Sequence, residues 1–269
     1  MEIIFNDVIF NNSKPLNIEI KSNNIACFLG NDDSIGSDIL KSVIAIKKPV
    51  EGFINVNNKY VYKNKQTGFN TLRSEILYIG EEVINTLFLD KVMDVFELTL
   101  KLYKVDNFDI SKLLESLDLD EDIIYRKLND ISESEKIRIL FLAGIIKKPN
   151  IILLDKIITR LDPNLQKKFI NFLKKLKHSS DVIIIINTND SEVALKVSDK
   201  LYIVDDEKVV LDGMKYDVFK EVNILNDINI KIPNIIDFEN IVYNKKGIKI
   251  GSRDEINDLI KDIYRYVKW

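Results

Sequence analysis

The stretch Ile151-Ile152-Leu153-Leu154-Asp155 decides the fold class, because four apolar residues in a row lead straight into a carboxylate. Two other runs, at residues 25–29 and 182–186, share this pattern and also end in polar residues. Short continuous apolar runs are typical of strands that are buried on both faces of a parallel sheet. With helical patterning after the first two runs, the sequence predicts an α/β fold whose ligand site lies beyond the carboxyl ends of these strands.

The regions around these strands show other patterns. Short alternating runs at residues 3–10, 16–20, 53–56 and 60–62 predict an N-terminal antiparallel β layer. Residues near 91–104 and 109–118 have helical spacing, which predicts a helical insertion over about 83–140. The first core helix is expected to run through Ile46, with Asp33-Ser34 or Ser37-Asp38 as its cap. We therefore expect an α/β core with these additions over 1–220 and a C-terminal extension over 221–269.

The composition argues against several classes of function. The 269 residues include 39 basic and 42 acidic side chains, and this near balance argues against nucleic acid as a partner. With one cysteine, Cys27, and one histidine, His178, the chain lacks the ligands of a Cys/His metal centre. We expect Cys27 to be buried in its strand, His178 to be exposed at a helix end, and Lys174, Lys175 and Lys177 to form a solvated face. No apolar run approaches the roughly 20 residues that span a bilayer, so a cytoplasmic protein is expected.

Several short motifs occur in a fixed order along the chain. They are Lys48-Pro49-Val50-Glu51-Gly52-Phe53-Ile54, Lys148-Pro149-Asn150, Leu154-Asp155, Leu161-Asp162-Pro163, Asp212-Gly213-Met214, Val218-Phe219-Lys220 and Ile232-Pro233-Asn234. This series resembles the ATP-binding subunits of ABC transporters, and its last motif resembles the energy-coupling-factor branch, which powers vitamin and metal uptake. The resemblance implies an ABC-type P-loop NTPase core, ATP with Mg²⁺ as the ligand, a dimer, and a membrane subunit docked on the helical insertion.

The loop after residues 25–29 departs from the P-loop of this family, in which backbone N–H groups and a lysine surround the phosphates in G-x-x-x-x-G-K-[ST]. The positions that the resemblance assigns to nucleotide binding are Gly30, Asn31, Asp32, Asp33, Ser34, Ile35, Gly36, Ser37 and Asp38. In family register Ile35 replaces a glycine and Gly36 replaces the lysine, whereas a shift by one residue puts Ser37 at the lysine position. Neither register supplies a cation. Each carboxylate about 5 Å from a phosphate charge costs roughly 3 kcal/mol at an effective dielectric near 20.

Other family positions have changed as well. Lys156 stands where active members have the glutamate that orients the attacking water, and a protonated lysine cannot accept a proton. The remaining departures are Asn189 at the switch histidine, Glu81 at the glutamine, Asn12 at the adenine-stacking aromatic, and Ser132-Glu133-Ser134-Glu135 in place of Ser-Gly-Gly-Gln. Ser132 keeps its identity as a nucleotide contact, and Ser37 and Asp155 are the Mg²⁺ ligands that the resemblance implies if nucleotide binds. The stretch from Ser132 also reads as a well-capped helix start, with acidic residues that favour the helix dipole.

These substitutions favour a degenerate ABC-type subunit, a pseudo-ATPase that pairs with a paralogous ATP-binding subunit or with itself. Such a subunit serves as a non-hydrolysing scaffold or regulator and lies at the inner face of the membrane where a membrane subunit holds it. One alternative is an ATP-binding component that still binds ATP, through backbone amides, Ser37 and Asp155, and couples hydrolysis to transport. A stand-alone binding module that uses the fold away from a membrane is another.

Relative to the family, the charges of the loop and of the residue after Asp155 are reversed, and this leads to one geometric expectation. The loop gains Asp32, Asp33 and Asp38, while Lys156 follows Asp155, and the two segments are expected to end neighbouring parallel strands. We therefore expect the Lys156 ammonium to lie within salt-bridge reach of one of these four carboxylates. Such a pair would close the crevice without a ligand.

Overall fold

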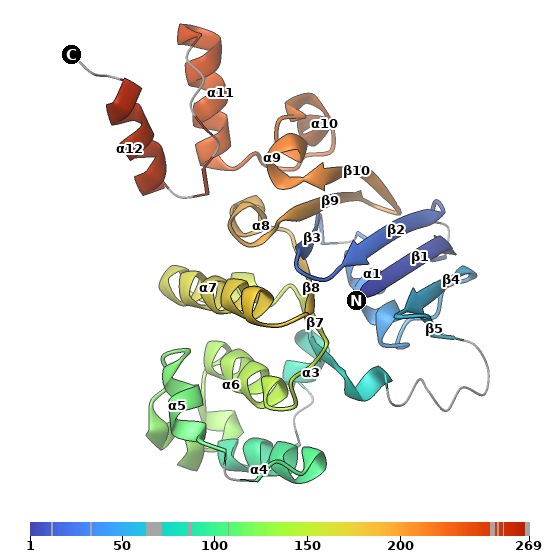
Figure 1. The fold of residues 1–269 in the computed structure, drawn as a ribbon, viewed down its shortest axis with the longest axis vertical. Coiled ribbons are helices and arrows are strands. Elements are labelled where there is room, and N and C mark those ends of the chain that lie inside the picture. Colours follow the sequence, from blue (N-terminus) through green and yellow to red (C-terminus); the bar gives the residue numbers. More distant parts are fainter. Residues whose placement is uncertain are drawn as a thin grey trace.

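A six-stranded, mostly parallel sheet forms the centre of the chain (Figure 1). The computed structural model describes residues 1–11, 13–32, 34–62, 72–85, 88–106, 108–247, 251, 253–254 and 256–266. The strand order is β10 (Lys208–Met214), β9 (Lys200–Asp205), β3 (Ile25–Gly30), β8 (Ile183–Thr188), β7 (Ile151–Asp155) and β6 (Ile76–Ile79). Every pairing is parallel except that of β10 with β9. The α/β class and its three strongest strands are confirmed.

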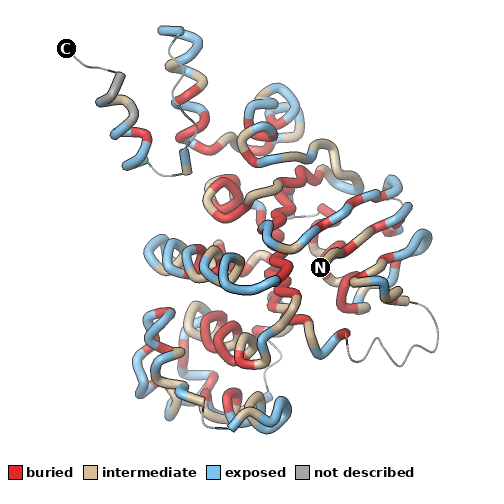
Figure 2. The backbone as a smooth tube through the Cα atoms, viewed as in Figure 1, coloured by how far each residue is buried: buried red, intermediate tan, exposed pale blue. Residues whose placement is uncertain are grey.

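Both faces of this sheet are covered, which explains why its strands are apolar throughout. Within β3, Ile25, Cys27 and Leu29 belong to one apolar core, whereas Ala26 and Phe28 belong to a second core on the opposite face. Strands β7 and β8 divide in the same alternating way. Figure 2 shows the resulting band of buried backbone through the middle of the molecule. Cys27 is fully buried, as expected, and burial raises the pKa of its thiol.

The N-terminal layer is a four-stranded antiparallel sheet in the order β2 (Leu16–Lys21), β1 (Glu2–Ile9), β4 (Glu51–Val56) and β5 (Lys59–Tyr60). Helix α1 (Gly36–Val43) packs against both sheets through Ile39, Leu40 and Val43. Gly52 has φ +78°, and a Cβ at this position would lie 2.2 Å from the Asp7 carbonyl oxygen. The start of β4, where it passes close to β1, therefore requires glycine.

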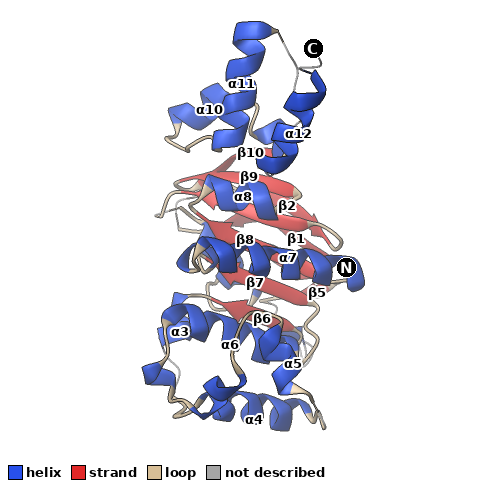
Figure 3. Ribbon diagram, turned by 90° about the vertical axis from the view of Figure 1, so that its left-hand side faces the viewer, coloured by secondary structure: helices blue, strands red, loops and turns tan. Residues whose placement is uncertain are grey.

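Helices cover the other face, as Figure 3 shows. Between β6 and β7 lie α3 (Glu81–Asn85), α4 (Val92–Tyr103), α5 (Ile110–Glu115) and α6 (Glu133–Ile145), followed along the chain by α7 (Pro163–Ser179) and α8 (Ser191–Val197). The two helices expected near 91–104 and 109–118 are confirmed as α4 and α5. His178 is exposed in the last turn of α7, as expected. The solvated lysine face is partly wrong, because the Lys177 side chain is 10% exposed and pairs with Asp199 at 2.9 Å.

Helix α1 differs from expectation at both ends. It begins after Ile35 without a side-chain cap, because Ser37 Oγ donates instead to Asp155 Oδ1 at 2.9 Å. It ends at Val43, and Ala45 adopts φ +58°, so the chain leaves the helix before Ile46. Asp33, one of the expected caps, lies outside the described residues.

The C-terminal part contains α9 (Lys215–Val218), α10 (Val222–Asp227), α11 (Asn234–Lys246) and α12 (Ile256–Tyr266). These helices follow β10 and extend beyond that edge of the sheet (Figure 1). In the part of the chain that the structure describes, no helix is both long enough and apolar enough to cross a membrane.

Candidate functional site

Three parallel strands, β3, β8 and β7, bring the candidate residues together at their carboxyl ends. Contrary to expectation, β3 and β7 are not neighbours, because β8 pairs with both of them. The end of β8 thus contributes side chains between the two segments, namely Asn187 within the strand and Asn189 just after it. Both asparagines take part in the contacts that close the crevice.

Lys156 forms the expected ion pair. Its Nζ lies 3.1 Å from Asp32 Oδ1 and donates to the Asp32 carbonyl oxygen at 2.8 Å. Asn189 Nδ2 donates to the same carboxylate oxygen at 3.0 Å. Lys156 and Asn189, the residues that the resemblance places at the catalytic glutamate and the switch histidine, therefore both bind the acidic loop. Of the other candidates, Asp38 pairs with Lys47 at 3.3 Å, and Asp33 and Asn12 lie outside the described residues.

Asp155 is buried and already has three hydrogen-bond donors. Its Oδ1 accepts from Ser37 Oγ at 2.9 Å and from Asn187 Nδ2 at 2.7 Å, and its Oδ2 accepts from Tyr78 OH at 3.2 Å. Burial and the nearby Asp155 charge raise the pKa of Tyr78, which keeps the phenol a donor. The two side chains assigned to Mg²⁺ by resemblance thus bind each other. Within the described ranges, no cluster of three or more His, Cys, Asp or Glu is placed to hold a metal ion.

Gly36 stands where the family register places the phosphate-binding lysine, and Asn187 occupies the adjoining space. A Cβ at Gly36 would lie 2.3 Å from Asn187 Oδ1. Asn187 is 2% exposed and is held by its bonds to Ser37 and Asp155. The space beside Gly36 that a longer side chain would need is therefore filled by Asn187. A lysine at position 36 would require Asn187 to move.

Backbone amides of the loop are also engaged. The Ile35 N–H donates to the Asp206 carbonyl at 3.0 Å, and the Ser34 N–H donates to the Asn31 carbonyl at 3.1 Å. In a P-loop such amides face the phosphates. The Ser34 hydroxyl is buried without a partner among the described residues. The loop thus satisfies part of its own hydrogen bonding within the chain.

A residue that sequence reasoning missed, Arg160, joins two of the altered positions. Its guanidinium lies 3.0 Å from Glu81 Oε2 through one nitrogen and hydrogen-bonds Glu133 through another. The bond to Glu133 is the main cause that raises the pKa of Arg160. The sequence contained a signal for this bridge. It has acids at Glu81 and Glu133, and a basic residue, Arg160, directly before the Leu161-Asp162-Pro163 motif.

The first turn of α6 is a capped helix start, as the sequence allows. Ser132 caps the helix by accepting from the Glu135 N–H, and the Glu135 carboxylate accepts from the Ser132 N–H at 2.7 Å. This reciprocal pair is a capping box. Ser132 and Glu135 therefore bind each other at the helix start, and Glu133 binds Arg160.

Known proteins resemble this chain in sequence and in fold. No family model matches the chain. The energy-coupling factor transporter ATP-binding protein EcfA1 of Mycoplasmoides gallisepticum is 26% identical over 254 residues, which cover 93% of this chain and 88% of that protein. EcfA2 of Clostridium perfringens is 23% identical over 244 residues, covering 90% and 85%. By sequence and by fold, the chain is related to the ATP-binding subunits of ABC transporters.

Solved structures of ABC ATP-binding subunits share the fold along most of the chain. CbiO1 of Clostridium perfringens, described as part of the cbiONQ transporter complex, superposes with a TM-score of 0.69 at 20% identity, covering 88% of this chain and 97% of CbiO1. A dimeric ATP-binding cassette bound to ADP and Pi superposes with a TM-score of 0.70 at 20% identity, covering 79% and 98%. The ABC-type α/β core with its antiparallel layer is thus confirmed.

Proposed function

We propose that the chain is a degenerate ABC-type subunit of the energy-coupling-factor kind, which acts as a non-hydrolysing scaffold or regulatory partner. The observation that carries the proposal is the ion pair between Lys156 and Asp32, with Asn189 on the same carboxylate. In an active cassette these positions orient water and face the γ-phosphate. Here they hold the loop, so the crevice is closed by the chain's own charges.

The residues around Asp155 do not fit Mg-ATP. The loop supplies no lysine, a side chain at Gly36 would collide with Asn187, and the Asp32 carboxylate adds a negative charge to the loop. Mg²⁺ would have to replace the hydrogen bond between Ser37 and Asp155. Without a base at Lys156 there is also no carboxylate to activate water. We therefore propose weak or no nucleotide binding and no hydrolysis.

We further propose that the subunit pairs with a paralogous ATP-binding subunit or with a second copy, and that a membrane subunit docks on its helical insertion. The names of relatives support this, since CbiO1 is part of the cbiONQ complex and the ADP-bound cassette is dimeric. In this chain Asp162 caps α7 through the N–H groups of Asn164 and Leu165, so the Leu161-Asp162-Pro163 motif keeps an ordered shape. Apolar side chains are exposed at the insertion, with Phe88 at 96% and Leu102 at 64%. The subunit would then lie at the inner face of the membrane.

An ATP hydrolysis assay on the purified chain tests the proposal. Phosphate release should remain at the level of an Asp155→Ala variant purified in parallel, because neither protein has a base or a phosphate-binding lysine. Turnover by the wild type that Asp155→Ala abolishes would contradict the proposal and favour an ATP-coupled transport component.

A further inference from the structure

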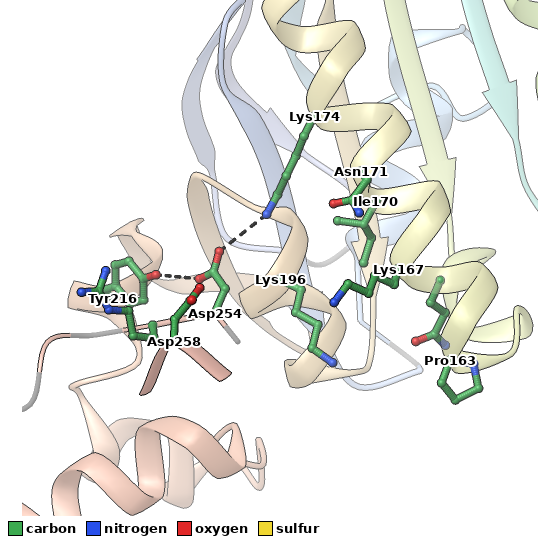
Figure 4. A pocket seen from close by; sticks show the side chains of 11 residues that line it. Pro163, Lys167, Ile170, Asn171, Lys174, Lys196, Tyr216, Asp254 and Asp258 are labelled. Atoms are coloured by element: carbon green, nitrogen blue, oxygen red, sulfur yellow. Dashed lines mark hydrogen bonds and ion pairs between the residues drawn. The ribbon is translucent and has the colours of Figure 1, made fainter. Parts of the chain in front are cut away.

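Helix α7 borders a hollow near each of its ends, and the two hollows differ in chemistry. Near the start of α7, Figure 4 shows Tyr216 and Lys174 turned toward Asp254, so polar groups of that hollow already bind one another. The second hollow, of about 390 Å³, lies between the last turns of α6 and α7 and the amino ends of β7 and β8. This volume falls in the range of ligand sites, about 300–1,000 Å³. Its lining residues in the described part of the chain include none of those around Asp155.

The wall of this second hollow is mostly apolar. Its apolar residues are Met1, Ile145, Pro149, Ile152, Leu176 and Val182. Ile152 and Val182 are nearly fully buried, whereas Ile145 and Leu176, in the last turns of α6 and α7, are only partly buried. Apolar surface therefore faces the hollow. A ring compound placed against it would be stabilised by about 25 cal/mol for each Å² of apolar area removed from water.

Serine hydroxyl groups at the rim can accept a hydrogen bond from a ligand. Ser179 Oγ and Ser180 Oγ both donate to the Leu176 carbonyl oxygen, at 3.2 and 2.8 Å. A hydroxyl has one O–H to donate and two lone pairs that accept. Because both donors are used within α7, the two serines offer acceptors. A ligand that complements them carries an O–H or N–H group.

The charges around the hollow nearly balance. The Asp181 carboxylate lies 3.5 Å from the Met1 ammonium, and a hydrogen bond from Ser22 keeps the pKa of Asp181 below its usual value. Lys148, which is exposed, is the other charged side chain of the described lining. The C-terminal ends of α6 and α7 border the hollow, and a helix end of this kind carries about half a negative elementary charge. Little net charge is left to attract an ion of either sign.

We propose that this hollow binds an uncharged, mostly apolar ring compound that carries one hydrogen-bond donor. The rings would pack against Ile145, Ile152, Leu176 and Val182, and the donor would bond to a serine hydroxyl at the end of α7. The ligand would thereby join the last turns of α6 and α7, at the opposite ends of β7 and β8 from Asp155. The proposal does not depend on the state of the Asp155 crevice.

The test is calorimetric titration of the full chain with three probes that share one ring system, 2-naphthol, 2-naphthoate and 2-naphthylmethylammonium. We expect saturable binding of 2-naphthol, about tenfold tighter than that of either ion, because a charge without a partner resists transfer into the hollow. Leu176→Trp should weaken 2-naphthol binding by about tenfold or more, since the indole ring takes the space of the ligand. Leu102→Trp, at an exposed residue of α4 outside the lining, should leave binding unchanged.

Asp181→Asn tests the charge balance separately. The substitution removes an exposed carboxylate from the rim, so 2-naphthoate should bind about threefold more tightly, as expected for an exposed charge interaction. Binding of uncharged 2-naphthol should stay the same. Circular dichroism of each variant verifies folding, and Ile145→Trp fills the hollow from α6 if Leu176→Trp does not fold.

Three results would overturn the proposal. One is the absence of saturable 2-naphthol binding to the wild type. Another is equal binding by the Leu102→Trp variant and a folded variant with tryptophan in the hollow, which would place the probe elsewhere on the protein. The third is binding of either ion as tight as that of 2-naphthol, or no response of 2-naphthoate to Asp181→Asn, which would contradict the selection of an uncharged ligand.

Discussion

Lys156 and Asp32 reverse the charges that an ABC-type nucleotide site needs. An active site has a cation in the loop and a carboxylate after the Walker B aspartate, whereas here the carboxylate is in the loop and the cation follows Asp155. The Asp32 side chain is 72% exposed, so the pair contributes only about 0–1 kcal/mol to stability. Under the proposed function, its importance lies in closing the crevice that phosphate and water would need to enter. Stability and nucleotide affinity should therefore respond differently when this pair is changed.

The packing of Gly36 against Asn187 leads to a stability prediction. Gly36→Ala should lower the free energy of unfolding by about 1–3 kcal/mol, because the new Cβ displaces Asn187 from its bonds to Asp155 and Ser37. In an Asn187→Ala background the same substitution should cost nothing, since the obstacle is gone. Urea denaturation of the four proteins of this cycle gives the comparison. Equal costs in both backgrounds would show that Asn187 does not restrict position 36.

Arg160 connects three elements, the starts of α3 and α6 and the short 3-10 turn Ile158–Arg160 before α7. An acid–base–acid arrangement links these segments within one chain. The bridge joins the helical insertion to the α/β core without nucleotide. Removing its centre leaves the two glutamates near each other, so the cost should come from repulsion as well as from lost bonds.

We therefore expect Arg160→Gln to destabilise the protein by about 1–2 kcal/mol at low salt, and by less at high salt, where exposed charges are screened. Adding Glu133→Gln should recover part of the loss, because it removes one of the two opposing charges. Denaturation at two ionic strengths measures both effects. A loss that neither salt nor Glu133→Gln changes would mean that Arg160 acts through packing alone.

Helices and strands could be predicted from the sequence where one hydrophobic pattern determined them. Continuous apolar runs identified β3, β7 and β8, because burial on both faces leaves no polar positions. Strand order was not predictable, and the intervening β8 brought Asn187 and Asn189 into the site. Both ends of α1 were also missed, because Ser37 binds Asp155 instead of capping the start and Ala45 takes the chain out of the helix before Ile46. Arg160 escaped notice because its partners come from segments distant in sequence.

For the whole molecule, the proposed loss of chemistry does not imply loss of association. Under the proposed function, the ABC-type core, the ordered Leu161-Asp162-Pro163 motif and the exposed apolar residues of the helical insertion would carry the assembly. We expect affinity purification from the native host to recover a paralogous ATP-binding subunit, a membrane subunit or a second copy of the chain. Light scattering of the purified protein at high concentration complements it. A monomer with none of these partners would contradict the scaffold role.

Calorimetric titration of Mg-ATP into the wild type, Lys156→Glu and Asp155→Ala proteins tests the central claim most directly. The account predicts no binding in the micromolar range by the wild type at the Asp155 crevice, because Lys156 and Asn189 hold Asp32 in place and Asn187 fills the lysine position. Any weak binding should become tighter in Lys156→Glu, because the substitution removes the ammonium that holds Asp32. Micromolar binding by the wild type that Lys156→Glu does not strengthen and Asp155→Ala abolishes would contradict the closed site.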